Sequence, residues 1–352
     1  MTSQLVFGAG LIGCYLGGCL SLVARKQKKP HTVYLYCRQR MGQALQQGMV
    51  LTDYQENRAE LSDVSVITEL TSNCTEPVDI IWLTVKCTAI NQAISDMAPF
   101  VGPKTVILCC QNGLGVDHLL RKAYPHNEVL RVMVPFNVVT LADGHFHRGS
   151  QGSLTLESSA YDERLTRLLC APDDISSNQG KGLLPIAFTA DMTAVQWAKL
   201  QLNLGNSVNA LANVPVKAML EQREFRRIIA AMMEELLLVT NALGLKLPKV
   251  ASVEGRFIPF ILRLPNWLFK RVANKMLAID PTVKTSMWWD LHSGKKTEVD
   301  FLNGAVLAQA EQLGLVCPVN EKIVEMIHDA EASATINLTI SATELSQKVG
   351  IK

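Results

Sequence analysis

The chain has 352 residues, of which 48% are hydrophobic and 19% charged, a composition typical of a globular protein with room for two cores. Its formal net charge of +2 gives no indication of a nucleic-acid or acidic partner. It contains no pattern typical of a signal peptide and no apolar run long enough to span a bilayer, so we expect no stable membrane insertion.

Nine cysteines are scattered along the chain without a CxxC pair or a cluster of cysteines and histidines. Scattered thiols in an odd number are typical of reduced cysteines, so we expect a cytoplasmic protein without a structural metal site. His145 and His147 have the spacing of neighbours on one face of a strand. Because no third ligand lies near them, we interpret them as residues of a sheet edge and predict no metal.

The first motif is a glycine-rich turn. A short strand over residues 4–7 precedes the sequence GAGLIG, and an apolar helix follows it. Gly8 would permit the tight turn, Gly10 would let the backbone approach a pyrophosphate at the helix N-terminus, and Gly13 would let the helix lie close to the sheet. The alternative is a glycine turn in an unrelated α/β unit. The predicted cofactor-binding residues of this turn are Gly8, Gly10, Leu11, Ile12 and Gly13.

A second strand over residues 32–37 leads directly to Arg38. Folds that prefer NAD usually place an acidic residue here, where it binds the ribose hydroxyl groups. An arginine can instead pair with the 2′-phosphate of NADP. Because the carboxylate is missing, we predict NADP(H) as the cofactor. A solvated surface arginine is the alternative.

Two further buried strands, over residues 78–85 and 105–110, are each followed by a polar residue that could bind a ligand. Lys86 follows the first strand, and Asn112 lies just beyond the second in an Asn-Gly turn. In an open parallel sheet, ligands bind beyond the carboxyl ends of the strands. We therefore predict that Lys86 and Asn112 bind cofactor or substrate. Simple strand-end polarity is the alternative.

The pattern from Leu130 to Leu156 predicts antiparallel strands that complete the sheet. A loop-rich stretch then places the domain boundary at residue 188. The predicted architecture is α/β, with a Rossmann-type dinucleotide-binding domain over residues 1–188 and an all-helical domain over residues 189–352.

Polar side chains lie along one face of an otherwise apolar helix over residues 191–212. Lys199, Asn203, Asn206 and Ser207 have the spacing i, i+4, i+7 and i+8. Buried polar groups need partners or a function, so this face is a candidate substrate surface. A solvated face with an apolar back is the alternative.

Residues 256–278 combine aromatic and aliphatic residues with lysines and arginines, and Pro259 and Pro265 interrupt them. A membrane-surface helix, a dimer surface and a lid over the site remain open alternatives for this segment. No role is assigned to it.

Residues 284–304 are predicted to form a helix, a turn and the start of a second helix. Ser286 and Asp290 would share one face of the first helix, and Thr297 with Asp300 resembles a capping box that opens the second. Polar groups would thus gather at the junction, where they can converge on a small solute. Two surface helices joined by a polar turn are the alternative.

Five motifs together resemble the ketopantoate reductase family, the 2-dehydropantoate 2-reductases, over almost the whole chain. They are the GAGLIG turn, Lys86 after its strand, the Asn112-Gly113 turn, Lys199 with Asn203, and the stretch from Ser286 through Glu298 to Asn303. Where many members have an asparagine one turn after Asn203, this chain has Ser207 with Asn206 beside it. This difference leaves open which of the two side chains contacts the substrate.

The resemblance implies residue roles. Lys199 would be the general acid, and Glu298 would bind a substrate hydroxyl group and influence the charge of the lysine. Lys86 and Asn112 would face the nicotinamide and the substrate. The expected substrate-binding residues are Asn112, Lys199, Asn203, Ser207, Ser286 and Glu298. We expect Lys199 and Glu298 to meet over the nicotinamide ring in a cleft between the domains.

The implied activity is that of an oxidoreductase: NADPH-dependent reduction of 2-dehydropantoate to pantoate, for pantothenate and coenzyme A synthesis. One alternative is a related enzyme that reduces another branched 2-oxo acid. A second is a non-catalytic NADP-binding sensor, which the retention of Lys199 and Glu298 disfavours. A homodimer is compatible with the sequence.

Overall fold

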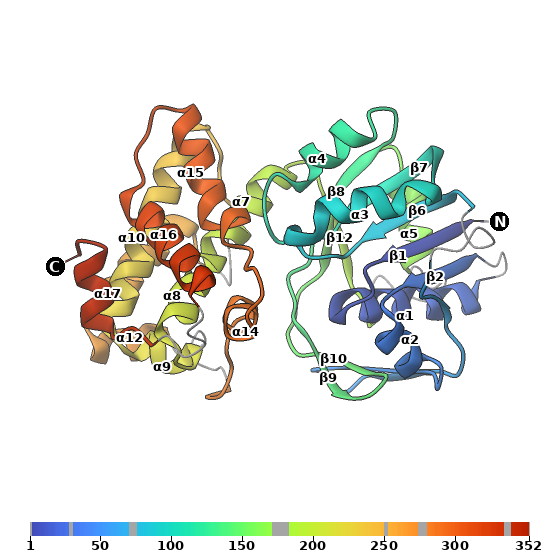
Figure 1. The fold of residues 1–352 in the computed structure, drawn as a ribbon, viewed down its shortest axis with the longest axis horizontal. Coiled ribbons are helices and arrows are strands. Elements are labelled where there is room, and N and C mark those ends of the chain that lie inside the picture. The colour runs from blue at the N-terminus through green and yellow to red at the C-terminus, as the bar shows by residue number, and fades with distance from the viewer. Residues whose placement is uncertain are drawn as a thin grey trace. The chain divides into compact units, whose positions relative to one another are not determined.

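The computed structural model describes residues 2–27, 31–69, 76–170, 183–249, 253–273, 280–333 and 339–351. The chain divides into two compact units, Met1–Met192 and Thr193–Lys352, coloured blue to green and green to red in Figure 1. The predicted boundary at residue 188 falls inside the last strand of the first unit, β12 (Ile186–Thr189).

The first unit contains a large sheet of eight strands among the described residues. Neighbouring strands are parallel except for one antiparallel pair, β8 with β11. Helices cover both faces: α3 (Ile90–Met97) and α4 (Val116–Ala123) lie on one face, and α1 (Leu11–Lys26) and α5 (Asp162–Leu169) on the other (Figure 1). The strand order is β12, β11 (Leu154–Glu157), β8 (Val129–Met133), β7 (Val101–Cys109), β6 (Val78–Leu83), β1 (Ser3–Phe7), β2 (Thr32–Tyr36) and β5 (Ser65–Ile67).

A second, four-stranded sheet has the order β4 (Arg58–Leu61), β3 (Met49–Asp53), β10 (His145–Arg148) and β9 (Val138–Ala142). The prediction that all strands between 130 and 156 complete the main sheet is therefore only partly right. The strands β8 and β11 join the main sheet, but the β9–β10 hairpin pairs with β3. This pairing joins residues that are 95 positions apart in sequence, such as His145 and Val50, so no local pattern indicates it.

His145 and His147 lie on β10, an internal strand of the small sheet, so their interpretation as edge residues is wrong. Each has a ring nitrogen 2.9 Å from the Thr52 hydroxyl oxygen. Within the described ranges, no three histidine, cysteine or acidic side chains gather in a way that could hold a metal ion.

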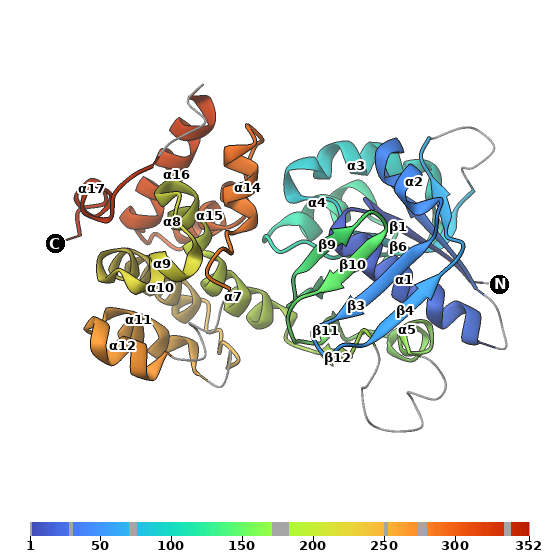
Figure 2. The same ribbon diagram turned by 90° about the horizontal axis from the view of Figure 1, so that it is seen from below.

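Helix α1 is covered by both sheets, and Figure 2 shows the small sheet face-on with α1 behind it. Glycines make this double contact possible. A Cβ atom on Gly17 would lie 2.9 Å from the side chain of Leu35 in β2, and one on Gly18 would lie 2.5 Å from the sulfur of Met49 in β3. The helix that follows the glycine-rich turn is thus fixed on two sides by close packing.

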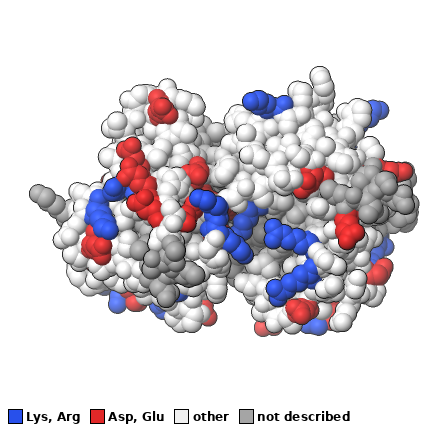
Figure 3. Space-filling view, in the orientation of Figure 1, with Lys and Arg blue, Asp and Glu red and all other residues white. Residues whose placement is uncertain are grey.

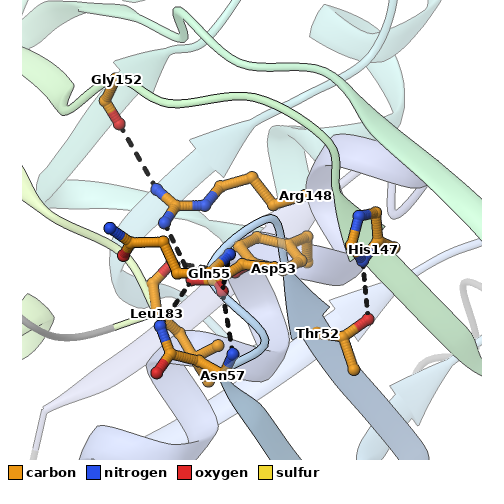
Figure 4. A network of polar contacts seen from close by, with 9 residues as sticks. Thr52, Asp53, Gln55, Asn57, His147, Arg148, Gly152 and Leu183 are labelled. Atoms are coloured by element: carbon orange, nitrogen blue, oxygen red, sulfur yellow. Dashed lines mark hydrogen bonds and ion pairs between the residues drawn. The ribbon is translucent and has the colours of Figure 1, made fainter. Parts of the chain in front are cut away.

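A buried ion pair lies beneath the small sheet, at the ends of β10 and β3 (Figure 4). Arg148 Nη2 donates to Asp53 Oδ2 at 3.0 Å, and the two side chains are 1% and 0% exposed. Burial alone would raise the pKa of Asp53, but hydrogen bonds from Asn57, Gln55 and Arg148 outweigh burial and lower this pKa below its usual value. The carboxylate therefore stays charged and paired inside the unit.

The second unit is helical among its described residues, and it is organised around the long helix α10 (Arg223–Ala242). The predicted helix over 191–212 is interrupted at Leu204, which separates α7 (Met192–Asn203) from α8 (Gly205–Ala212). No helix in the described parts of the chain has the length and apolar character needed to cross a membrane. The remaining helices are α9 (Val216–Glu221), α11 (Ile258–Arg263), α12 (Asn266–Val272), α14 (Ser286–His292), α15 (Asn303–Gln312), α16 (Pro318–Ala332) and α17 (Ala342–Lys348).

The segment predicted over 256–278 forms the two short helices α11 and α12, and its residues after 273 lie outside the described part of the chain. The buried guanidinium of Arg226 in α10 joins these helices. It donates to the carbonyl oxygens of Leu262 at 2.9 Å and Leu264 at 2.7 Å, and it lies 4.1 Å from the centre of the Phe269 ring. The segment is therefore attached to α10 through backbone carbonyl groups.

The buried Arg148–Asp53 pair leads to a prediction about stability. Arg148→Met should lower the free energy of unfolding by about 3–5 kcal/mol, because it leaves the Asp53 carboxylate buried without its partner. The double variant Arg148→Met/Asp53→Leu should lose less, because both charges are gone. Urea denaturation measures both changes.

Arg58→Met is the matched control, because Arg58 forms an exposed ion pair with Glu60 in the same sheet. Its expected loss is below about 1 kcal/mol. An Arg148→Met variant as stable as the Arg58→Met variant would contradict the role given to the buried pair.

Candidate active site

The glycine-rich turn closes tightly against the strand ends beside it. Gly8 has φ of +91°, and a Cβ atom there would lie 2.8 Å from the backbone nitrogen of Val85. A Cβ atom on Gly13 would lie 2.9 Å from the carbonyl oxygen of Gly8. Both positions therefore exclude any larger residue, as the predicted roles in turn formation and helix packing require.

Gly10 differs from Gly8 and Gly13 because the space around its Cα is open. A Cβ atom there would meet only the carbonyl oxygen of Gly8, at 3.9 Å. Gly10 is the N-cap residue of α1, and no side chain caps the helix there. Leu11, Ile12 and Gly13 form its first turn, whose N–H groups have no acceptor within the helix. Open space beside uncapped N–H groups fits a phosphate group.

Three predicted ligands lie at the same edge of the large sheet as this turn. Arg38 follows β2, Lys86 follows β6 and Asn112 follows β7, and all three side chains are exposed. Because these strands are parallel to β1, their carboxyl ends share the edge that carries the glycines. The structure thus brings together the predicted cofactor-binding residues of the first unit.

Two residues that support this edge are not among the predicted ones. The Thr84 hydroxyl group donates to the carbonyl oxygen of Gly8 at 2.9 Å. The buried Gln111 amide donates to the carbonyl oxygens of Leu83 at 2.9 Å and Val85 at 3.0 Å. They hold the loops after β6 and β7 in place. The only signal in the sequence was their position beside Lys86 and Asn112.

In the helical unit, three of the four residues of the predicted polar face are accessible, and the fourth is buried. Lys199, Asn203 and Asn206 are partly exposed along α7 and α8. Ser207 is fully buried, and its hydroxyl group donates to the Leu204 carbonyl oxygen at 2.8 Å. The geometry therefore argues against the prediction that Ser207 binds substrate. Asn206 occupies the accessible position instead.

Lys199 is the titratable group that stands out on this face. Burial lowers the pKa of its ammonium group from the usual value of 10.5, because removal of water penalises the charged form. A lysine with a lowered pKa gives up its proton more readily and is a better general acid near neutral pH.

Helix α14 presents Ser286 at its exposed first position. The preceding residue, Thr285, caps the helix by accepting from the N–H of Trp288 at 3.3 Å. The Asn209 side chain in α8 accepts from both the backbone and the hydroxyl group of Thr285, each at 3.0 Å. These bonds fix the start of α14 to α8. Asp290, predicted to share a face with Ser286, is buried.

Glu298 lies at the start of a short 3-10 turn over Val299–Phe301, and α15 begins only at Asn303. The predicted capping box of Thr297 with Asp300 is therefore wrong. The Thr297 hydroxyl oxygen accepts from the N–H of Val299 at 3.3 Å, and the Thr297 N–H donates to Glu331 in α16. Glu298 itself is partly exposed, like Lys199, and both belong to the helical unit.

The charges of the molecule are mixed in sign. In Figure 3, basic and acidic side chains occur on the displayed surface of both units, and most of that surface is uncharged. This distribution agrees with the net charge of +2.

Comparisons with known proteins match the two units separately. Residues 4–160 match the family model described as ketopantoate reductase PanE/ApbA. Residues 191–331 match the model for the C-terminal part of ketopantoate reductase PanE/ApbA.

The similar proteins include a 2-dehydropantoate 2-reductase from Streptococcus pyogenes, 23% identical over 340 residues, which are 94% of this chain and 98% of that protein. A 2-dehydropantoate 2-reductase from Pyrobaculum aerophilum is 26% identical over 230 residues, 65% of this chain and 71% of that one.

Solved structures share the fold. A PanE/ApbA family ketopantoate reductase from Ralstonia eutropha has a TM-score of 0.74 at 24% identity, covering 94% of this chain and 99% of that one. A D-mandelate dehydrogenase with NADH and anilino(oxo)acetate has a TM-score of 0.71 at 17% identity, with the same coverage. A dimeric ketopantoate reductase from Staphylococcus aureus has a TM-score of 0.70 at 18% identity, again with this coverage.

The predicted fold class and the resemblance noted in the sequence are thus confirmed. With family models matching both of its units, this chain belongs to the ketopantoate reductase PanE/ApbA family.

Proposed function

We propose that this chain reduces 2-dehydropantoate to pantoate with NADPH, in the pathway to pantothenate and coenzyme A. The observation that carries the proposal is the partly buried Lys199, whose pKa is lowered by burial on the polar face of the helical unit. The names of the family and of the relatives from Streptococcus and Pyrobaculum support the choice of substrate.

The residues of the first unit fit a dinucleotide. The open space at Gly10 and the first-turn N–H groups of α1 would accept the pyrophosphate. Arg38, exposed after β2, would pair with a 2′-phosphate, which favours NADPH over NADH. The bound cofactor would supply the hydride. Lys86 and Asn112 at the same edge would contact the nicotinamide end.

The helical unit would supply the proton. In a 2-oxo acid, the carbonyl oxygen becomes an alkoxide as the hydride reaches the carbon. The Lys199 ammonium group would hydrogen-bond this oxygen, stabilise its developing charge and donate the proton. Partial burial suits this task, because it strengthens the interaction with the oxygen and lowers the pKa of the lysine.

The other accessible polar groups would orient the substrate. Glu298 would accept a hydrogen bond from a substrate hydroxyl group and influence the charge of Lys199. Ser286 and Asn112 would hold the carboxylate or the carbonyl group. Asn203 would contact the substrate beside Lys199, and we assign Asn206 rather than Ser207 to the next turn because Ser207 is buried.

A homodimer and a cytoplasmic location remain predictions. The dimeric enzyme of Staphylococcus aureus shares the fold and supports the former.

A steady-state assay tests the proposed function. Purified protein should oxidise NADPH in the presence of 2-dehydropantoate, and should do so faster than it oxidises NADH. No oxidation with 2-dehydropantoate, beside turnover of another 2-oxo acid, would contradict the proposed substrate. No oxidation with any 2-oxo acid would contradict the reductase and favour a protein that only binds the cofactor.

A second candidate substrate is a 2-oxo acid with a larger apolar group. Trp289 lies three residues after Ser286 in α14 and is 61% exposed, so both side chains lie on the accessible part of the helix. An exposed indole ring would contact an apolar substituent more favourably than a hydroxyl group. The substrate panel should therefore include a 2-oxo acid with a phenyl group.

The role of Lys199 gives a sharp prediction. Lys199→Ala should lower kcat by roughly a hundredfold or more, as loss of a general acid does, while the affinity for NADPH stays nearly unchanged. Lys199→Arg should also be slow, because arginine keeps the charge but does not release its proton. In the wild type, kcat should fall as pH rises through the pKa of Lys199, at a pH below 10.5.

Lys270→Ala is the control, because Lys270 is an exposed lysine of α12 in the same unit. A Lys199→Ala variant as active as this control would remove Lys199 from the proposed role.

Arg38 gives a prediction about the cofactor. Arg38→Asp should shift the preference from NADPH towards NADH, because a carboxylate repels the 2′-phosphate and can accept from the ribose hydroxyl groups. The ratio of kcat/KM for the two cofactors measures the shift. Arg40→Asp makes the same change of charge two residues later, at another exposed position, and should leave the ratio nearly constant. Equal ratios for the two variants would count against NADP.

A further inference from the structure

The turn that carries Glu298 lies along α16 and is bound to it at three points. Near its start, Glu331 accepts from the N–H of Thr297 at 2.7 Å. In the middle, His328 bonds to the Asp300 carboxylate at 2.8 Å. At its end, the Asn303 amide donates to Asn320 Oδ1 at 2.9 Å.

These three partners lie on one side of α16. Asn320, His328 and Glu331 have the spacing i, i+8 and i+11, which brings them within a quarter turn of one another around an α-helix. We define them as the α16 stripe. The turn runs in the opposite direction to the helix, since its first residue meets the last member of the stripe. One face of one helix therefore fixes the whole turn.

Glu331 is the strongest of these contacts. Its side chain is only 4% exposed, and besides the Thr297 N–H it binds the Lys296 ammonium group at 2.9 Å and the Thr297 side chain. Burial works to raise the pKa of Glu331, but these bonds outweigh it and lower the pKa. The carboxylate thus stays charged, and charged acceptors make the stronger hydrogen bonds.

Asn320, at the other end of the α16 stripe, is fixed by α10. The carboxylate of Glu235 in α10 accepts from the backbone N–H of Asn320 at 2.9 Å and from its amide group at 2.7 Å. Because the amide nitrogen of Asn320 is engaged there, its oxygen faces Asn303. Asn303 and Asn320 are both 0% exposed. The register between the turn and α16 is therefore set by buried bonds.

We propose that Glu331 is a positioning residue for Glu298, and that the α16 stripe sets where the Glu298 carboxylate points. The inference rests on the substrate-binding role proposed for Glu298. Glu298 directly follows Thr297, whose backbone Glu331 binds, so a shift of that peptide moves Glu298. A misplacement of about 1 Å can lower turnover by two orders of magnitude.

Two conservative variants separate positioning from charge. Glu331→Gln keeps one acceptor oxygen at the same reach for the Thr297 N–H, but it loses the charge and the second oxygen, which accepts from Lys296. Glu331→Asp keeps the charge, but its side chain is shorter by one methylene group. The carboxylate would therefore no longer reach the Thr297 N–H, and this hydrogen bond would be lost. We expect Glu331→Asp to lower kcat with the 2-oxo acid by roughly tenfold to a hundredfold, with Glu331→Gln close to the wild type. A role through charge alone predicts the reverse order and would overturn the proposal.

Two measurements show whether the effect is local. KM for NADPH should stay unchanged in both variants, because its predicted ligands belong to the other unit. Amide hydrogen exchange in a peptide covering residues 297–303 should become faster in Glu331→Asp. Glu325→Ala is the matched control, because Glu325 forms an exposed ion pair with Lys322 on the same helix. Exchange and kcat in Glu331→Asp that equal those of Glu325→Ala would overturn the inference.

Failure of the proposed function can be distinguished from failure of the positioning role. A wild type that turns over no 2-oxo acid would refute that function, while hydrogen exchange would still report whether Glu331 holds the turn. Lys296→Ala completes the set, since it removes the exposed partner of Glu331 and leaves the Thr297 bond. Its kcat should match that of the wild type, and a loss equal to that of Glu331→Asp would contradict positioning through the backbone.

Discussion

The partial burial of one ammonium group is the constraint on which the proposed chemistry depends. Lys199 lies on a helix that is otherwise largely apolar, and burial lowers its pKa. Such a group costs folding free energy that an exposed lysine would not cost. In the proposed reaction this cost has a benefit, because a desolvated acid interacts strongly with a developing negative charge.

Each unit holds its own proposed ligand-binding residues in place by close packing. In the first unit, α1 is enclosed by two sheets, and the buried Arg148–Asp53 pair lies where the small sheet meets that helix (Figure 4). Close packing around α1 therefore also fixes the glycine-rich turn at its start. In the second unit, α8 fixes the start of α14, and α16 fixes the turn that carries Glu298. Preorganised groups of this kind are what a catalytic site requires.

Local patterns in the sequence correctly predicted those features that depend only on neighbouring residues. The roles of Gly8 and Gly13 in the turn, and the exposed strand-end positions of Lys86 and Asn112, follow from strand and turn signals that involve neighbouring residues. The fold class follows from the same signals. The structure agrees with these predictions because parallel strands place their carboxyl ends at one edge whatever their order in the sequence.

The errors arose where distant segments decide the outcome. The hairpin of β9 and β10 pairs with β3, and Thr297 binds Glu331, which is 34 residues away, instead of closing a capping box. Tertiary contacts outweighed local preference in both cases. Ser207 is buried and its hydroxyl group donates to the Leu204 carbonyl oxygen, although helical spacing places it on the same face as Lys199.

The most direct test of the account is a titration of Lys199 itself. Nuclear magnetic resonance of protein labelled at its lysine side chains can follow each amine with pH, and the Lys199→Ala variant identifies the signal by its absence. The account predicts a pKa below the usual value of 10.5 for this lysine, because burial penalises its charged form. A Lys199 amine that titrated at or above 10.5 would not be desolvated, and the proposed general acid would be contradicted.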